Sequence, residues 1–373
     1  MSSRLESTSR IHITRDGDML TMDCKPRFSE LELSYYSRHM VLDEIGSKGQ
    51  RRLKESRVLV AGLGGLGSPL SIQLASLGVG YLRLVDRDIV EVSNLQRQQL
   101  YGFDVVGYPK VEAATMRLAK VNPFIELEPI PESLNTGNAK RLLEGVDVVV
   151  DGLDRMAPRY ALNRACLETR TPYVYGAVIT HMGNASTIIP GETPCLECFQ
   201  GGLDDTNILT CATVGVTPSI IAIIASIQVS EAVRIMLGRK PNLAGKLLFC
   251  DLEDLSFDSI NLARVEGCPV CGARKTEQKP TEFVEEICGR DGRRVFVITP
   301  EETVRLNLCE VAGRLRKRGL KLDVEAKMGV TFSGEPTLKG SILISGVGII
   351  EGLKNSEEAV SLYTASTGQG KKS

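Results

Sequence analysis

The chain has 373 residues, and its hydrophobic share of 42% and charged share of 24% are those of an ordinary globular protein. This composition excludes disordered, collagen-like and coiled-coil chains, and the length predicts more than one domain. The 45 Lys and Arg residues balance 46 Asp and Glu residues, for a formal net charge of -1. We therefore expect neither a nucleic acid nor an anionic membrane as a partner.

Cysteines are the main metal ligands that this sequence offers. It contains 10 cysteines and only 3 histidines, so a His-rich metal centre is excluded. Two Cys-x-x-Cys pairs, in a long chain without a recognisable signal peptide, favour metal binding in a reducing compartment over disulfides. We expect a cytoplasmic protein with a cysteine-bound metal.

The first expected elements lead into a glycine-rich turn. Residues 1–28 show no sustained hydrophobic period, which predicts a flexible N-terminal arm, and a helical pattern follows over 30–53. A strand is expected over 57–61, and glycines and a helix over 68–77 follow it directly. Strand, glycine turn and helix in this order open many nucleotide-binding folds.

The next strands end in carboxylates. The pattern predicts, in order, strand 81–85, helix 110–121, strand 125–129 and strand 146–150. Strands that alternate with helices predict an α/β, Rossmann-like fold with a mostly parallel sheet. Ligands bind such sheets at the carboxyl ends of the strands, so Asp86 and Asp154 lie where a ligand would bind.

A strongly apolar segment spans residues 218–237. Ser226, Gln228, Glu231 and Arg234 interrupt it, and its apolar run falls short of the roughly 20 residues that cross a bilayer. We therefore expect a buried helix here.

The composition changes after Lys275 to a polar linker. Beyond it the pattern predicts strands over 283–288 and 294–298, a turn at 290–292, and helices over 306–318 and 357–363. We expect a main domain over 29–275 and a small α+β domain over 276–373. Recruitment of a partner protein is our hypothesis for this second domain.

The glycines form a phosphate-binding pattern. Gly62, Gly64, Gly65 and Gly67 match Gly-x-Gly-x-x-Gly between a strand and a helix, where backbone N–H groups hold phosphate. Asp86, at the end of the second strand, is placed to accept hydrogen bonds from ribose hydroxyls. These residues predict a nucleotide or dinucleotide ligand without distinguishing between the two.

Further motifs decide between these ligands. They are Asp86-Arg-Asp88, Ser93-Asn94-Leu-Gln-Arg97-Gln98, Gly107-x-x-Lys110 and Asp154-(x4)-Arg159-(x3)-Asn163. Together with the glycine turn, these motifs resemble the ThiF/MoeB/HesA superfamily of ubiquitin-activating-type adenylyltransferases over residues 30–275. The resemblance implies that ATP and the C-terminal glycine of a ubiquitin-like protein react to give an acyl-adenylate and pyrophosphate.

The resemblance also implies roles for single residues. A carboxylate nucleophile is ionised at neutral pH, so the obstacle is charge repulsion at the α-phosphate, and cations should dominate the site. Arg97 and Lys110 would neutralise phosphate oxygens, Asn94 would orient the nucleotide, and Asp154 would hold Mg²⁺. Arg38 corresponds to an arginine that reaches into the other subunit's ATP site, which implies a homodimer.

The two cysteine pairs form a zinc site in such enzymes. Cys195, Cys198, Cys268 and Cys271 would give Zn²⁺ a closed four-sulfur shell, which is typical of a structural site. Cys211 corresponds to a cysteine that joins the activated protein or a sulfur carrier in some relatives, and a buried packing residue is its alternative reading. Asn follows the magnesium aspartate in many relatives, whereas Arg155 stands here.

Our prediction is a homodimeric adenylyltransferase that uses ATP, Mg²⁺ and Zn²⁺. Its partner would be a small β-grasp protein ending in Gly-Gly, with a sulfur donor protein as a further candidate. The product would serve molybdopterin or thiamine synthesis, tRNA thiolation or protein conjugation. The alternatives are a tRNA threonylcarbamoyladenosine dehydratase-type enzyme of the same superfamily, an NAD-dependent oxidoreductase and a non-enzymatic adaptor.

Overall fold

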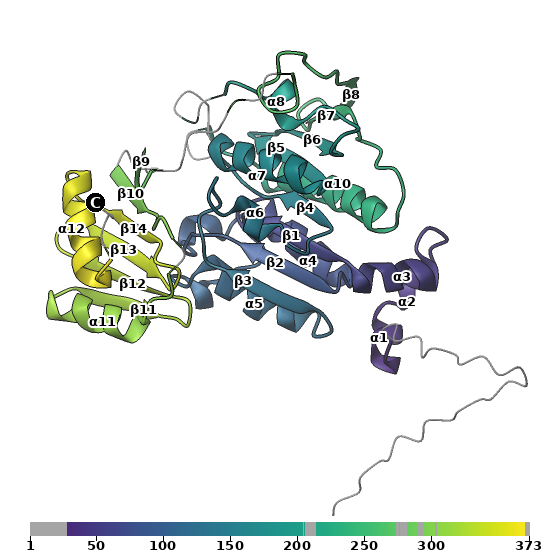
Figure 1. Cartoon of the computed structure of the whole chain (residues 1–373). Coiled ribbons are helices and arrows are strands. Elements are labelled where there is room, and N and C mark those ends of the chain that lie inside the picture. The colour runs from purple at the N-terminus through teal and green to yellow at the C-terminus, as the bar shows by residue number, and fades with distance from the viewer. Residues whose placement is uncertain are drawn as a thin grey trace, which may run out of the picture.

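The computed structural model describes residues 28–203, 205, 214–273, 276, 282–288, 294–302 and 304–369 (Figure 1). The predicted N-terminal arm lies outside the described residues except for Phe28. Cys211, the turn at 290–292 and most of the polar linker also lie outside them.

The larger of two sheets has the order β3-β2-β1-β4-β5-β6-β7-β8. Its parallel part comprises β1 (Arg57–Ala61), β2 (Tyr81–Val85), β3 (Glu126–Ile130), β4 (Val148–Asp151) and β5 (Tyr173–Ile179). The strands β6 (Met182–Ile188), β7 (Lys246–Asp251) and β8 (Ser256–Asn261) then continue it as an antiparallel extension. The parallel half confirms the Rossmann-like prediction.

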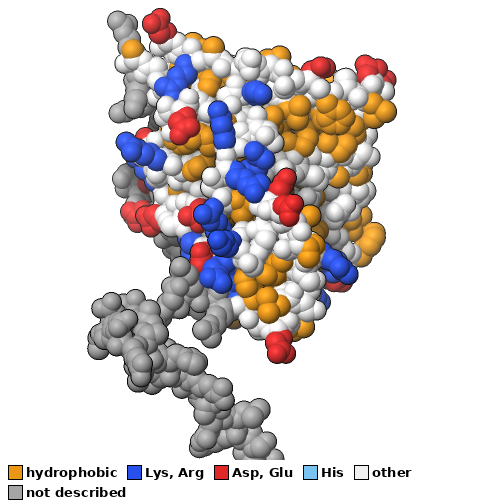
Figure 2. Space-filling view, turned by 90° about the vertical axis from the view of Figure 1, so that its right-hand side faces the viewer, with side chains coloured by type: hydrophobic (Ala, Val, Ile, Leu, Met, Phe, Trp, Pro, Cys, Tyr) orange, Lys and Arg blue, Asp and Glu red, His pale blue; other side chains and the backbone are white. Residues whose placement is uncertain are grey.

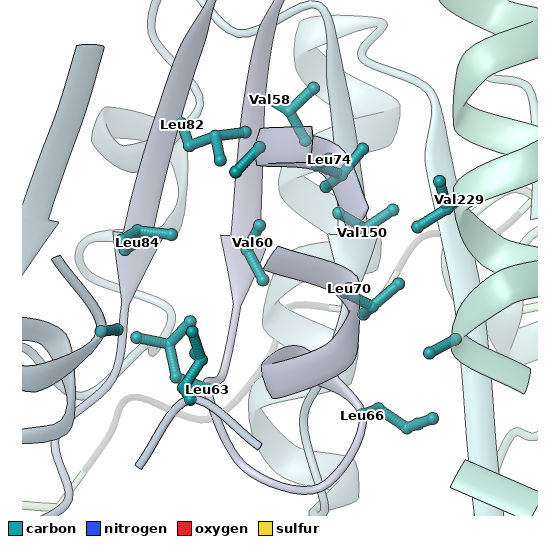
Figure 3. Packing of buried hydrophobic residues seen from close by; sticks show 14 of the residues in the cluster. Val58, Val60, Leu63, Leu66, Leu70, Leu74, Leu82, Leu84, Val150 and Val229 are labelled. Atoms are coloured by element: carbon teal, nitrogen blue, oxygen red, sulfur yellow. The ribbon is translucent and has the colours of Figure 1, made fainter. Parts of the chain in front are cut away.

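Helices cover both faces of this sheet. One face carries α4 (Gly67–Leu77), α5 (Lys110–Val121) and α10 (Pro218–Met236), and the other carries α6 (Ala139–Leu142), α7 (Met156–Thr169) and α8 (Leu196–Phe199). Figure 3 shows Leu70 and Leu74 of α4 and Val229 of α10 packed against Val60 of β1 and Val150 of β4. These contacts hold the start of α4 beside the end of β1.

The apolar segment forms α10, as predicted. Among the described residues, α10 is the one helix whose length and composition would allow it to cross a membrane. Its Ile220, Ile224 and Val229 are buried in the core, and the helix packs against β4, β5 and β6. It is the core helix that the sequence predicts.

The helical pattern over 30–53 forms three short helices. They are α1 (Glu30–Tyr35), α2 (Ser37–Met40) and α3 (Gly46–Glu55). The buried Tyr36 lies between α1 and α2, and its hydroxyl accepts a hydrogen bond of 2.8 Å from Asn122. The backbone turns again at Gly46, whose φ is 56°. The chain therefore forms three separate helices in place of one continuous helix.

The second sheet is antiparallel throughout and has the order β11-β12-β13-β14-β10-β9. Its strands are β9 (Val284–Cys288), β10 (Arg294–Ile298), β11 (Lys321–Glu325), β12 (Gly329–Gly334), β13 (Leu338–Leu343) and β14 (Gly348–Glu351). Packed on it are α11 (Leu308–Lys317) and α12 (Ser356–Thr367). We call this part, residues 282–369, the C-terminal sheet unit; it lies beside the parallel half of the large sheet (Figure 1).

Candidate active site

A cleft of about 1340 Å³ opens at the ends of β1, β2 and β4. Ligand pockets usually have volumes of roughly 300–1,000 Å³, so this cleft has room for more than a small molecule. Among its lining residues are predicted site residues from distant parts of the chain, namely Gly62, Gly64, Gly65, Asp86, Arg97, Lys110 and Asp154. The fold therefore brings these residues together, as the sequence predicts.

The glycine turn needs glycine because backbone segments approach each other closely. Gly62 has φ 85°, and a Cβ there would lie 2.7 Å from the carbonyl oxygen of Gly152. A Cβ on Gly67 would lie 1.9 Å from the carbonyl oxygen of Gly62. Gly67 is buried and does not line the cleft, so it serves this packing, whereas Gly64 and Gly65 face the cleft.

Asp86 holds the glycine turn against the end of β2. Its Oδ2 accepts a hydrogen bond of 2.6 Å from the N–H of Leu63, and its Oδ1 accepts one of 2.7 Å from the N–H of Asp88. Burial raises the pKa of Asp86, while the charge of Lys110 opposes this shift. Each carboxylate oxygen keeps a second lone pair, so Asp86 can still accept hydrogen bonds from a ligand.

Lys110 is a buried cation at the cleft wall. Its ammonium lies 2.8 Å from Oδ2 of Asp88, and its side chain is only 6% exposed. Burial alone would lower the pKa of Lys110, but the carboxylates of Asp88 and Asp86 more than offset this and raise the pKa. Lys110 therefore stays charged at neutral pH and can attract an anion.

Arg97 and Asn94 belong to the same turn, but only Arg97 lines the cleft. Nη1 of Arg97 donates a 2.7 Å hydrogen bond to the carbonyl of Ser93, and the side chain lines the cleft. Asn94 is buried and is not among the cleft-lining residues; its Oδ1 accepts a 3.2 Å hydrogen bond from the N–H of Glu91. In this structure Asn94 shapes the turn that presents Arg97.

Asp154 lies exposed in the cleft, on the loop that follows β4. A buried ion pair supports this loop: Nε of Arg159 lies 3.0 Å from Oδ2 of Asp151. Nη2 of Arg159 also donates to the carbonyl of Leu153 at 2.6 Å. Arg159 therefore fixes the backbone next to Asp154.

The four predicted zinc ligands lie together. Their sulfur atoms are all within 4.8 Å of one another, and three pairs are 3.3, 3.5 and 3.9 Å apart. The sulfurs of tetrahedral zinc, with Zn–S bonds of about 2.3 Å, are about 3.8 Å apart, so this donor set fits Zn²⁺. The cluster is formed by Cys195, Cys198, Cys268 and Cys271.

Helix α7 connects the metal cluster to the cleft. Oδ1 of Asn163 accepts a 3.1 Å hydrogen bond from the N–H of Leu196 in the first cysteine pair. Arg164 forms two 3.0 Å hydrogen bonds with Glu197 and donates to the carbonyl of Thr276, just after the second pair. Because α7 begins directly after the Asp154 loop, the cluster supports one wall of the site.

Of the predicted residues that the structure describes, Arg38 lies away from the cleft, as Gly67 and Asn94 do. Arg38 lies exposed on α2 and does not line the cleft, which is compatible with a role in a second subunit's site. Cys211 lies outside the described residues.

Sequence reasoning left several cleft residues without a role. Gln98 is 2% exposed, lines the cleft and has no hydrogen-bond partner for its Oε1. The sequence could have indicated Gln98 as a cleft residue, because it directly follows Arg97 in the same motif. Arg155 forms ion pairs with Glu285, at 2.6 Å, and with Asp205, at 3.6 Å. No sequence pattern indicates these contacts.

The family model described as "ThiF family" matches residues 36–270. The chain belongs to the ThiF family. This match confirms the resemblance that the motifs indicate, and it ends before the C-terminal sheet unit begins.

Named relatives match this part of the chain over most of their own length. The SAMP-activating enzyme E1 of Haloferax volcanii is 40% identical over 65% of this chain and 89% of its own length. The sulfur carrier protein adenylyltransferase of Thermus thermophilus is 37% identical over 70% of this chain and 99% of its own length. The molybdopterin-synthase adenylyltransferase of Escherichia coli is 40% identical over 65% of this chain and 98% of its own length.

Solved structures support the fold. The crystal structure of E. coli MccB with ATP has a TM-score of 0.56 at 24% identity, and covers 64% of this chain and 74% of that chain. At this identity the likeness shows the shared fold alone.

Proposed function

We infer that this protein is an ATP-dependent adenylyltransferase that activates the C-terminal carboxylate of a small ubiquitin-like protein. One observation carries the inference: in a chain of the ThiF family, Arg97, Lys110 and Asp154 line a single cleft with the glycine turn. Relatives with 37–40% identity are named as adenylyltransferases or as an activating enzyme.

The reaction joins two anions, so the site must reduce their repulsion. A carboxylate oxygen of the partner would bond to the α-phosphorus, and the bond from that phosphorus to the bridging oxygen of pyrophosphate would break. Lys110, which stays charged, and Arg97 would neutralise the phosphate oxygens. Gly64, Gly65 and Leu66, directly before α4, line the same cleft, and a helix N-terminus favours phosphate.

Mg²⁺ and Zn²⁺ would have different tasks. Asp154 offers an exposed carboxylate in the cleft, and one carboxylate completed by substrate phosphates is a common way to bind Mg²⁺. Bound there, Mg²⁺ would neutralise charge on the phosphates. Zn²⁺ on four cysteines has no open position, so it would be structural and stabilise the wall formed by α7 and the cysteine pairs.

The antiparallel extension supports a place for the partner's tail. Met182 of β6 and Phe249 of β7 are 44% and 42% exposed, and both line the cleft. They offer apolar surface in the same cleft as Asp154, and a tail that ends in Gly-Gly would be slender enough to enter it. We propose a β-grasp sulfur carrier or modifier as this partner, with a sulfur donor protein and Cys211 acting after adenylation.

We also propose a homodimer in which Arg38 acts on the other subunit's site. Val41 and Leu42, close to Arg38, are 73% and 51% exposed, and Leu31 is 67% exposed. Figure 2 looks onto the side of the molecule that carries α1, α2 and α3 and shows apolar side chains gathered there in patches. Exposed apolar patches of this kind mark interaction surfaces.

Exchange of labelled pyrophosphate into ATP tests the activity. We expect exchange that depends on a small Gly-Gly-ending protein and that Asp154→Ala and Arg97→Ala abolish. Arg117→Ala, on the exposed side of α5, is the matched control and should keep full exchange. If ATP binds but no β-grasp protein supports exchange, a tRNA or small-molecule carboxylate becomes the better substrate. Saturable NAD binding without exchange would instead favour the oxidoreductase.

A further inference from the structure

One carboxylate of the C-terminal sheet unit faces the cleft between two arginines. Oε1 of Glu285, on β9, accepts a 2.6 Å hydrogen bond from Nη2 of Arg155, and its Oε2 lies 3.5 Å from Nη1 of Arg87. All three residues line the cleft. Arg87 directly follows Asp86, and Arg155 directly follows Asp154. Glu285 therefore bridges the loop of the expected ribose carboxylate and the loop of the expected Mg²⁺ carboxylate.

A second contact holds the segment of Lys110. Glu112, in the first turn of α5, is 8% exposed and accepts hydrogen bonds from the N–H groups of Lys327, at 3.1 Å, and Met328, at 2.8 Å. A Cβ on Gly107 would lie 2.7 Å from Cγ2 of Val324, so the turn before Lys110 packs tightly against β11. The C-terminal sheet unit thus touches three of the segments that carry predicted site residues.

Further contacts join the unit to the segment after β3, which also lines the cleft. The hydroxyl of Ser345 donates to the carbonyl of Pro131, and the hydroxyl of Thr299 lies 3.3 Å from that of Ser133. Thr299 and Ser133 both line the cleft. The sheet unit is therefore part of the cleft wall and is not a separate module on the surface.

The charges around Glu285 keep it ionised. Burial raises the pKa of Glu285, but Arg155 and then Arg87 outweigh burial and lower it. Asp205 lies 3.6 Å from Arg155, Asp88 lies 4.0 Å from Arg87, and the charge of Asp154 also acts on Arg155. The two guanidinium groups are thus held by fixed carboxylates on both sides.

We propose that the C-terminal sheet unit is a wall of the nucleotide cleft and that Glu285 is a positioning residue for adenylation. By holding Arg87 and Arg155, it keeps the loops of Asp86 and Asp154 at the spacing that ATP requires. This role rests on the adenylyltransferase function proposed above, and it replaces partner recruitment as the task of this unit.

The test compares Glu285→Ala with Glu286→Ala in the full-length protein. Glu286 is on the same strand, is exposed and pairs with Arg294 at 2.8 Å, and it does not line the cleft. ATP affinity is measured by calorimetry without a partner protein, and the KM values for ATP and for the partner are measured by pyrophosphate exchange. We expect Glu285→Ala to weaken ATP binding about tenfold, to raise the KM for ATP and to leave the KM for the partner unchanged, with Glu286→Ala like wild type.

Further variants separate positioning from a loss of folding. Glu285→Gln keeps the shape of the side chain and removes its charge, and the double variant with Arg155→Ala should lose less ATP affinity than the sum of the two single changes. Wild-type protein that binds no ATP would overturn both this proposal and the proposed function. ATP binding to Glu285→Ala that matches Glu286→Ala would overturn the proposal alone. Tighter ATP binding would overturn it too, since Glu285 would then compete with phosphates for the arginines.

Discussion

Asp151 and Arg159 show how single buried charges support the site. Asp151 is fully buried and accepts hydrogen bonds from Arg159, from the hydroxyl of Tyr173 at 2.6 Å and from the N–H of Leu153 at 2.8 Å. Arg159 also lines the cleft and donates to the carbonyl of Leu153, so the pair fixes the loop that carries Asp154. A buried carboxylate without its partner is costly, because burial penalises the charge that remains.

Removal of the arginine should therefore cost much stability. We expect Arg159→Ala to lower the free energy of unfolding by about 3–5 kcal/mol, measured by urea denaturation. The exposed Arg117→Ala should change it by less than about 0.5 kcal/mol. A similar, small effect for both changes would contradict the structural role of the Asp151–Arg159 pair.

Single residues also mark where sequence reasoning stops. The resemblance to the ThiF family identifies Arg97 and Lys110 as site residues, which spacing alone would not do, and both line the cleft. It does not show that Asn94 is buried in the turn, which depends on local hydrogen bonds. Nor does it show the pairing of Arg155 with Glu285, because contacts between residues so far apart in sequence depend on how two sheets pack.

At the scale of elements, periodicity predicts β1, β2, β3 and β4 of the large sheet, but not the fifth parallel strand, β5. The predicted bounds of β1, β2 and α5 agree with the structure, since each is a short apolar strand or an amphipathic helix between clear end signals. The antiparallel extension was not predicted, because β6 and β8 carry mixed polar residues without a clear alternation. The helical pattern before β1 was predicted, but not its division at Tyr36 and Gly46.

The cysteine cluster belongs to this scale, since it joins the start of α8 to the segment after β8. We expect purified protein to contain one Zn²⁺ per chain, measured by plasma emission spectrometry, because the described cysteines form a single four-sulfur cluster. Cys268→Ser should lose the metal and lower the melting temperature. Cys309→Ser, at an exposed cysteine outside the cluster, should keep both. Metal-free wild-type protein of unchanged stability would contradict a structural zinc site.

At the scale of the whole molecule, the stability that Glu285 contributes by joining the two sheets should depend on pH. The folded pKa of Glu285 is lowered, so its contribution to stability is present above its unfolded pKa of about 4.3 and is lost as the pH falls through the folded value. The difference in unfolding free energy between wild type and Glu285→Gln should be constant from pH 6 to 8 and shrink below about pH 4. Both proteins carry the same cysteine cluster, so loss of metal in acid cancels in this difference. A difference that persists in acid would show that the charge of Glu285 is not responsible.

Mixing two inactive variants tests whether Arg38 acts in the other subunit's site. Arg38→Ala and Asp154→Ala should each abolish pyrophosphate exchange. When the two variants are mixed and allowed to exchange subunits, half of the dimers are mixed, and each mixed dimer has one site with both Asp154 and the other subunit's Arg38. Half of the dimers therefore have one complete site out of two, and the other dimers have none. Activity should return to about a quarter of the wild-type value. If Arg38 served the site of its own chain, every site in the mixture would lack one of the two residues. No activity would then return, although size-exclusion chromatography would still detect a dimer.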